Sequence, residues 1–424
     1  MSNSPDRSGA ADPGILGGPA GAGASSDVQQ GFKHSLRALR HRNFKLFFLG
    51  ALISNSGNWL QNATIPFVLY EITGSAKWVG FAAFSQFLPL MLLGPLGGSI
   101  ADRQDRRRVL LVAQSALAVL AGVLWFVWNA GVRNPWVILL IVALSGSVAG
   151  VSIPSWQALV PALVPKEDLS SGITLNSLQF NAARAVGPAI AGALLATIGP
   201  SWAFFINAVS YSTVIAALAV IRIPRSKVDK PKSGVMKDFG VAVRYIRTQP
   251  GIGVGILVAV VVAALGNPVL QFTTLIVKDV YDAGPVAFGL LSASLGLGAI
   301  ISAPFVSGWD ATLSRSTVVR WALPAYGLSI VMLGLSQQLW VGVIALILAG
   351  GGFLAVISTT NTAVQLIVSD QMRGRVMAAR VMSFTGAYPI GSLIQGALAD
   401  EFGVGRVVTV SGSLLVVVAL WMAL

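Results

Sequence analysis

Amide side chains recur at helical spacing inside long apolar stretches of this chain, and they are its main candidates for binding a polar molecule. In the first stretch Asn55, Asn58 and Asn62 fall on one face of a helix, with Trp59 and Gln61 beside them. Polar groups inside apolar helices either bind a ligand or hydrogen-bond to a neighbouring helix, and the sequence leaves both roles open. Two later stripes have the same kind of spacing: Asn267, Gln271 and Thr274, and Ser358, Asn361 and Gln365.

Arg184 is the strongest single candidate, because it is a cation inside an apolar helical stretch. A charged side chain near the centre of a membrane helix costs about 2.5–3.5 kcal/mol, so its presence requires a reason. It shares a helix face with Ser177, Asn181 and Pro188. It either binds an anionic group, donates hydrogen bonds to the carbonyls of a neighbouring helix, or extends toward the cytoplasmic end of its own helix.

Catalytic and metal-binding patterns are missing from the sequence. No glycine–lysine pair of a nucleotide-binding loop occurs, and no nucleophile stands in a recognisable arrangement with a base. The chain has no cysteine, and its two histidines, His34 and His41, both lie near the N-terminus. We therefore expect neither an enzyme nor an ATPase, and no cofactor, disulfide or metal site.

The composition is that of a polytopic membrane protein, with 54% hydrophobic and 11% charged residues. Apolar runs long enough to cross a bilayer recur in two groups of six. This predicts an all-α protein with twelve transmembrane helices in two six-helix pseudo-repeats. The runs are 44–70, 76–101, 109–131, 136–163, 172–198 and 202–222, then 251–278, 286–308, 317–336, 339–368, 375–400 and 404–424.

The chain divides into four predicted parts. Residues 1–31 read as a disordered tail, 32–222 as the first six-helix half, 223–250 as a linker with a candidate surface helix from Val235, and 251–424 as the second half. The halves repeat weakly at an offset of 204 residues, which pairs Gly187 with Gly391 and Gly192 with Gly396. Prolines inside the runs are expected to kink helices rather than end them.

The formal net charge of +13 reflects topology rather than a nucleic-acid partner. Nearly all of the 29 lysines and arginines fall in tail, turns and linker segments on one predicted side of the membrane. By the positive-inside rule this side is cytoplasmic. We expect a multi-pass protein of the cytoplasmic membrane with both termini in the cytoplasm.

A basic turn separates the second and third runs. Asp102 ends one run and Arg103, Arg106, Arg107 and Arg108 follow before the next. Two membrane helices joined by so short a turn form a hairpin, and three nearby glycines would let these two helices approach closely. The arginines alone could also serve only to set topology. The glycines are Gly94, Gly97 and Gly98.

The run from Gly98 to Arg107, GSIADRQDRR, resembles the signature that the major facilitator superfamily carries between its second and third helices. Asp105 stands where the general pattern has glycine, and the resulting form looks like the branch of enterobactin exporters and macrolide efflux proteins. Further runs look like the same branch, so the resemblance covers everything after the tail. They are Leu36–Phe44, Ser54–Trp59, Leu175–Pro188 and Arg373–Met377.

The resemblance implies a secondary transporter that exports a bulky amphipathic small molecule, a siderophore or a drug, by proton antiport and alternating access. Such proteins are usually monomeric, and their cavity is lined chiefly by helices 1, 4, 7 and 10, three of which carry the amide stripes. Trp59 and Tyr388 would add aromatic surface. The resulting substrate-binding candidates are Asn55, Asn58, Trp59, Asn62, Arg184, Asn267, Gln271, Asn361, Gln365 and Tyr388.

The same resemblance implies a cytoplasmic gate, in which Asp102 contacts the start of helix 11 or the arginines near it and closes that side. The gate candidates are Gly98, Asp102, Arg103, Arg106, Arg107, Arg373 and Arg375.

The carrier of the coupling proton is less evident. The branch often has an acid where this chain has Asn58, and the acids that remain lie near helix ends. They are Glu71, Asp102, Asp279 and Asp400. This leaves two alternatives open: an importer or facilitator of the same fold, or a non-transporting membrane sensor or scaffold that uses the 222–250 segment.

Overall fold

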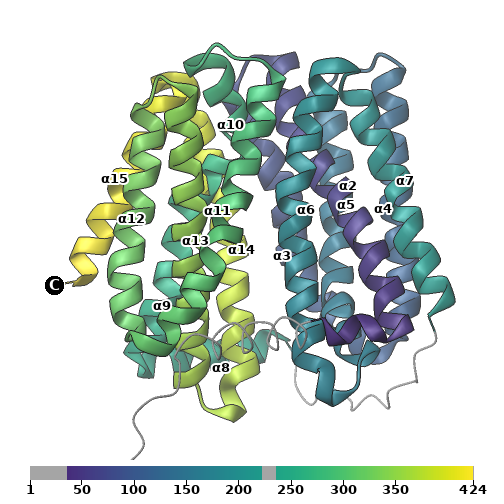
Figure 1. The fold of residues 1–424 in the computed structure, drawn as a ribbon, viewed down its shortest axis with the longest axis vertical. Coiled ribbons are helices and arrows are strands. Elements are labelled where there is room, and N and C mark those ends of the chain that lie inside the picture. The colour runs from purple at the N-terminus through teal and green to yellow at the C-terminus, as the bar shows by residue number, and fades with distance from the viewer. Residues whose placement is uncertain (1–35, 222–234, 424) are drawn as a thin grey trace, which may run out of the picture.

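A computed structural model describes residues 36–221 and 235–423, and this part of the chain is helical with no strand. Figure 1 shows two bundles of long helices side by side, one coloured purple to teal and the other green to yellow. The predicted all-α, polytopic architecture is confirmed. The predicted tail 1–31 and the segment 222–234 of the predicted linker lie outside the described residues.

The first bundle contains six long helices whose bounds agree with the predicted runs to within a few residues. Asn134 caps α5 through its side chain, and proline occupies the first position of both α5 and α7, as helix starts favour. The helices are α2 (Arg42–Thr73), α3 (Ala76–Arg103), α4 (Arg106–Asn129), α5 (Pro135–Leu159), α6 (Leu169–Thr197) and α7 (Pro200–Val220).

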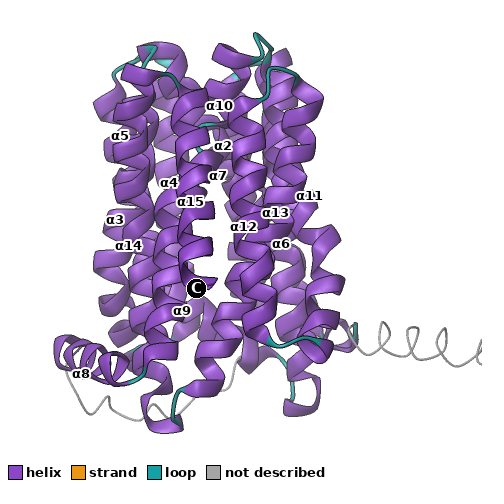
Figure 2. Ribbon diagram, turned by 90° about the vertical axis from the view of Figure 1, so that its left-hand side faces the viewer, coloured by secondary structure: helices purple, strands orange, loops and turns teal. Residues whose placement is uncertain are grey.

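The second bundle follows α8 (Val235–Thr248), a helix within the predicted linker that lies across one end of the molecule (Figure 2). We call this end, which also carries the turn between α3 and α4, the basic end. The bundle comprises α9 (Pro250–Val261), α10 (Thr273–Leu275), α11 (Pro285–Thr312), α12 (Arg315–Leu335), α13 (Leu339–Ile367), α14 (Asp370–Phe402) and α15 (Val404–Ala423).

One predicted run is not a continuous α-helix. After α9 the backbone passes through a π-helical segment, Val262–Gly266, and a 3₁₀ segment, Asn267–Leu270, before α10. Pro268 is the cause, because it lacks the N–H that would donate to the carbonyl of Ala264. Pro268 therefore changes the helix type locally, and Pro250–Val280 remains one helical span, as expected of a proline that does not end its helix. The other prolines of the predicted runs lie inside α-helices: Pro66, Pro89, Pro154, Pro188, Pro304, Pro324 and Pro389.

The amide of Gln395 on α14 repairs this break. Its Nε2 donates to the carbonyl oxygens of Ala264 at 2.8 Å and Leu265 at 3.2 Å, and the side chain is 4% exposed. Backbone groups in hydrocarbon must find partners inside the protein, so the side-chain amide replaces the missing backbone donor. Gly391 lets α14 approach, because a Cβ there would collide with the carbonyl of Ala264.

Nine helical segments of the described chain are long and apolar enough to cross a membrane. The other three predicted spans correspond to α2, α6 and α14, which contain 32, 29 and 33 residues and hold many of the polar candidates. The figure of twelve spans stays a prediction.

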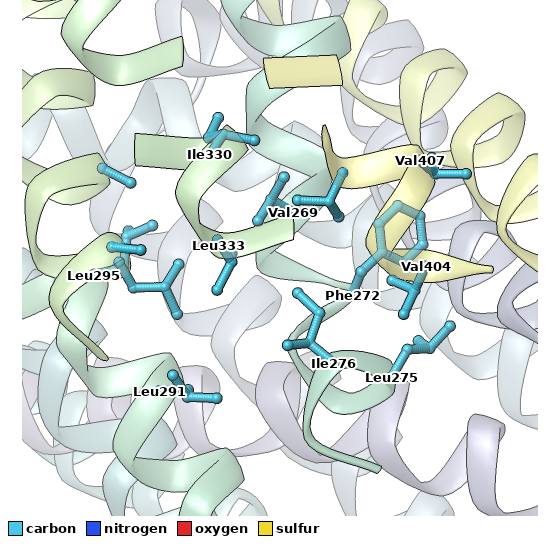
Figure 3. Close-up of a cluster of buried hydrophobic side chains, with 14 of the residues drawn as sticks. Val269, Phe272, Leu275, Ile276, Leu291, Leu295, Ile330, Leu333, Val404 and Val407 are labelled. Atoms are coloured by element: carbon cyan, nitrogen blue, oxygen red, sulfur yellow. The ribbon is translucent and has the colours of Figure 1, made fainter. Parts of the chain in front are cut away.

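An apolar cluster packs the segment after α9 against α11, α12 and α15 (Figure 3). Phe272 is fully buried in this cluster, which also contains Leu291, Leu333 and Val404. Close packing of this kind, with glycine at helix crossings, supplies most of the attraction between helices in a bilayer.

The predicted close approach of α3 to α4 near the basic turn is wrong. A Cβ on Gly97 would meet Gly150 and Val151 of α5, while one on Gly94 or Gly98 would meet no heavy atom within 4 Å. The glycine pattern near the turn marks a crossing, but the partner is α5 rather than the helix next in sequence.

Replacing Gln395 by leucine should lower the thermal stability of the protein in nanodiscs, because two carbonyls lose their donor. Interhelical hydrogen bonds in membranes contribute about 0.6–1.7 kcal/mol. In a Pro268→Ala background the backbone N–H is restored, so the same substitution should cost less. Equal losses in both backgrounds would contradict this role, and Gln365→Leu serves as the control.

Candidate functional site

Arg184 lies in the middle of the molecule between aromatic rings of both halves. Its Cζ is 5.7 Å from the ring centroid of Trp59 on α2 and 5.5 Å from that of Phe353 on α13. All three residues are near the midpoints of their helices. Attraction between a cation and ring faces stabilises this position, by up to about 2 kcal/mol when water is excluded.

The guanidinium of Arg184 has no hydrogen-bond acceptor within the described residues. This removes support for one of the predicted alternatives, in which it donates to the carbonyls of a neighbouring helix. Its place between Trp59 and Phe353 also differs from a side chain that extends to a helix end. Since one aromatic partner comes from each half, the Arg184 guanidinium lies where the two halves face each other.

The three asparagines of α2 hydrogen-bond to other helices of the first half. Asn55 Nδ2 donates to Gln179 Oε1 at 3.1 Å, and Gln86 Nε2 donates to Asn62 Oδ1 at 3.1 Å. Asn58 has a longer contact, 3.5 Å from the hydroxyl of Tyr211. Each amide thus acts as a link between helices, while its side chain keeps partial exposure.

In the second half the predicted stripes are only partly brought together. Gln271 Nε2 donates to the hydroxyl of Tyr388 at 2.8 Å, and the Tyr388 ring packs edge-on against Phe87 of the first half. Thr274 is fully buried and follows the π-helical and 3₁₀ segments, which interrupt the regular spacing on which the predicted face depended. Asn267 and Gln365 are partly exposed and make no side-chain hydrogen bond within the described residues.

Arg380 is an intramembrane cation that the sequence interpretation missed. It lies ten residues into α14, is 5% exposed, and donates to Asn361 Oδ1 at 3.0 Å and Thr360 Oγ1 at 3.2 Å. A third bond reaches the carbonyl of Ile357 at 3.3 Å. The signal was available, since Arg380 stands inside the apolar run 375–400 as Arg184 does inside its own.

At the basic turn Asp105 explains the departure from the general signature. Its side chain accepts hydrogen bonds from the backbone N–H of Arg107 at 2.9 Å and of Arg108 at 3.4 Å, so it caps the start of α4. Arg106 donates to the carbonyl of Ala158 at the end of α5. These bonds satisfy unpaired groups at helix ends.

Arg107 likewise secures the end of α7, where it donates to the carbonyls of Leu218 and Ala219, both at 2.5 Å. Cations near a helix C-terminus also interact favourably with its dipole. Arg106 and Arg107 therefore hold the first half together, a role beyond setting topology.

The remaining gate candidates are not brought together in this structure. Asp102 and Arg103 are exposed, and a Cβ on Gly98 or Gly374 would meet no heavy atom within 4 Å. Arg373 forms an ion pair with Asp370 at 2.6 Å instead, and Arg375 lies near Met372. The gate at the basic end stays a prediction.

The halves join at the opposite end, where three of the four acidic candidates lie, all except Asp102. The Tyr70 hydroxyl donates to the carboxylate of Asp279 at 2.7 Å, and Glu71 is 4.0 Å from Lys278. Asp400 accepts hydrogen bonds from the start of α3. An apolar cluster shared by both halves adds to this contact, with the Phe67 and Phe288 rings 5.5 Å apart.

Two helical bundles that meet at one end and surround a central cation define a membrane transporter of the major facilitator type. Residues 33–424 match the family model described as transmembrane secretion effector, and the chain belongs to this family of the superfamily. The curated relatives and the solved structures agree with this assignment.

The similar proteins include exporters and a siderophore transporter. The chain is 27% identical to the enterobactin exporter of Citrobacter koseri over 91% of this chain and 92% of that one. It is 25% identical to the staphyloferrin A transporter of Staphylococcus aureus, covering 87% and 92%. Identity to macrolide efflux protein A of Streptococcus pyogenes is 22%, covering 90% and 96%.

Solved structures share the fold. A bacterial homologue of the human lysosomal transporter Spinster, inward-facing and unoccupied, superposes with a TM-score of 0.70 at 16% identity, over 89% of this chain and 95% of that one. An inward-facing bacterial homologue of the iron transporter ferroportin superposes with a TM-score of 0.66 at 22% identity, over 89% of this chain and 98% of that one. At these identities the match establishes the architecture alone.

Replacing Arg380 by lysine should lower the apparent melting temperature in nanodiscs, because an ammonium cannot span all three acceptors on α13. The loss should be coupled to Asn361. Asn361→Ala is expected to cost about 0.5–2 kcal/mol less in the Arg380→Lys background than in the natural protein. Additive effects would contradict the contact, and the exposed Arg373→Lys is the control.

Proposed function

We propose that this transporter exports a bulky amphipathic molecule that carries an anionic group, of the siderophore or drug type, across the cytoplasmic membrane by alternating access. The observation that carries the proposal is the Arg184 guanidinium, which lies between Trp59 and Phe353 without a protein acceptor in the described chain. A half-buried cation without a counter-charge in this position is stabilised by an anion that enters the site.

The aromatic neighbours favour a substrate with flat apolar surface. Trp59 packs against Phe180 at 5.8 Å between ring centroids, and Phe353 packs against Tyr326 at 6.1 Å. Rings on two sides of a cation suit a molecule that combines an acidic group with aromatic or other apolar parts. Gln271 and Asn361 keep one polar atom each for further hydrogen bonds, because a single atom of each amide is engaged.

Export direction is supported by the relatives and by the charge distribution. The named relatives include an enterobactin exporter and a macrolide efflux protein. If the basic end faces the cytoplasm, as the positive-inside rule predicts, the contacts at the opposite end correspond to an inward-facing state. In that state the central site is reached from the cytoplasm, where an exported molecule is loaded.

Proton antiport is the proposed source of energy, with the protein acting as a monomer in the bilayer. The acidic candidates Glu71, Asp279 and Asp400 lie at the contact between the halves rather than beside Arg184. This distance from the central site also favours a second candidate, an importer or facilitator that uses no proton. An uncoupler distinguishes the two candidates in everted vesicles. It should abolish accumulation of substrate by a proton antiporter and leave transport by a facilitator that uses no proton unchanged.

Removing the charge of Arg184 should weaken the binding of an anionic probe. We choose 8-anilinonaphthalene-1-sulfonate, with uncharged N-phenyl-1-naphthylamine as its matched control, and purified protein in nanodiscs. Arg184→Gln should weaken binding of the sulfonate about ten-fold, with Arg184→Lys between that variant and the natural protein, while binding of the control changes little. Equal sulfonate affinity in all three proteins, or no binding by the natural one, would overturn the assignment.

The orientation can be tested with single cysteines, since the chain has none of its own. Ala130 lies in an exposed turn at the opposite end, and Gly240 is an exposed residue of α8. In intact cells a membrane-impermeant thiol reagent should label Ala130→Cys and leave Gly240→Cys unlabelled until the membrane is permeabilised. The reverse pattern would exclude the proposed topology.

A further inference from the structure

Helices α3 and α14 carry the same pattern at both of their ends, although they belong to different halves. Each is preceded by a serine N-cap, Ser75 or Ser369, whose side chain makes no capping bond to its own helix. Each ends in Gly-x-x-Ala-Asp, at residues 98–102 in α3 and 396–400 in α14. Since α3 runs toward the basic end and α14 runs away from it, each aspartate lies at the end of the molecule where the other helix begins.

At the opposite end the aspartate of α14 contacts the start of α3. Asp400 Oδ1 accepts from the backbone N–H of Ala76 at 2.5 Å, and its Oδ2 accepts from the Ser75 hydroxyl at 2.5 Å and the Lys77 N–H at 3.2 Å. A carboxylate from the second half therefore caps the first turn of a helix in the first half. This position satisfies unpaired N–H groups and lies at the positive end of the helix dipole.

Glycines allow the two backbones to meet beside this cap. A Cβ on Gly396 would lie 2.8 Å from the carbonyl oxygen of Ala76, and one on Gly80 would lie 2.6 Å from that of Ser392. Any larger side chain at these positions would separate α3 from α14. The contact continues to the middle of the helices, where Phe87 packs against Tyr388.

At the basic end the corresponding residues are apart. Asp102 is exposed and has no partner within the described residues, and a Cβ placed on Gly98 would meet no heavy atom within 4 Å. The N–H of Ser369 contacts the Tyr245 hydroxyl of α8 at 3.4 Å, which occupies part of the start of α14.

We propose that Asp400 is a latch that closes the opposite end, and that it alternates with Asp102 at the basic end as α3 and α14 tilt about their shared middle. We call the contact of Asp400 with residues 75–77 the Asp400 latch. One helix start gains its cap when the other loses it, so the two states exchange similar interactions and remain close in free energy. The proposal rests on alternating access but not on the substrate or on Arg184.

The test measures both ends of the protein in nanodiscs without substrate or gradient, by distances between spin-labelled cysteines. One pair, Ala130 and Gln337, reports the opposite end, and another, Lys166 and Leu313, reports the basic end. All four residues are exposed and lie outside the contacts described above. Because no substrate is present, a failure of the Arg184 assignment leaves this test unaffected.

Asp400→Asn should lengthen the spin-label distance at the opposite end and shorten the one at the basic end. The ratio of the two conformational states should shift about five-fold, which corresponds to the loss of one helix cap. Ser75→Ala should shift the ratio in the same direction by less. Asp102→Asn should favour the state seen in this structure, in which the opposite end is closed. The variant that carries both substitutions should return toward the ratio of states in the natural protein. The neighbouring exposed Glu401→Gln should have no effect.

Two results would overturn the Asp400 latch. The first is that both Asp400→Asn and Ser75→Ala give the same distance distributions as the control Glu401→Gln at both ends of the protein. The other is a shift of Asp102→Asn and Asp400→Asn in the same direction, because alternation requires opposite signs. The milder Ser75→Ala keeps the test decisive if Asp400→Asn does not fold.

Discussion

A positive charge that has no counter-charge among the described residues, held in the middle of a membrane-spanning bundle, is the constraint on which the proposed central site depends. Arg184 is partly stabilised by the rings of Trp59 and Phe353, but ring faces do not replace an anion. Because those rings come from different halves, a molecule bound to the cation in the proposed site would contact both halves. Such binding would link occupancy of the site to the relative position of the bundles, which is the requirement for transport by alternating access.

The other polar groups follow the rule that hydrocarbon leaves no backbone donor or acceptor unpaired. Gln395 supplies the donor that Pro268 removes, and Asp105 and Arg107 complete helix ends at the basic turn. Asp400 does the same for α3, but across the boundary between the halves. In the proposed Asp400 latch, this bond stabilises one conformation rather than the fold. The same physical rule then accounts both for rigid contacts within each half and for a reversible contact between the halves.

Hydrophobic run length predicted the helices well because it reports the thickness of the bilayer, and α3 differs from its predicted run only at the end. Side-chain partners were harder to predict. The stripe from Asn267 to Thr274 assumed an unbroken helix, and nothing local shows that Gln395, far along the chain, stabilises the break. The Asp102 signature identified the superfamily, yet its contacts depend on the conformational state, which a sequence does not specify.

The most direct test of the account is a cryo-electron microscopy structure of the protein in nanodiscs with 8-anilinonaphthalene-1-sulfonate bound. We predict density for the sulfonate about 2.7–2.9 Å from the guanidinium nitrogens of Arg184, with the naphthalene between Trp59 and Phe353. Density for the probe elsewhere in the bundle, with Arg184 hydrogen-bonded to a backbone carbonyl, would contradict the account.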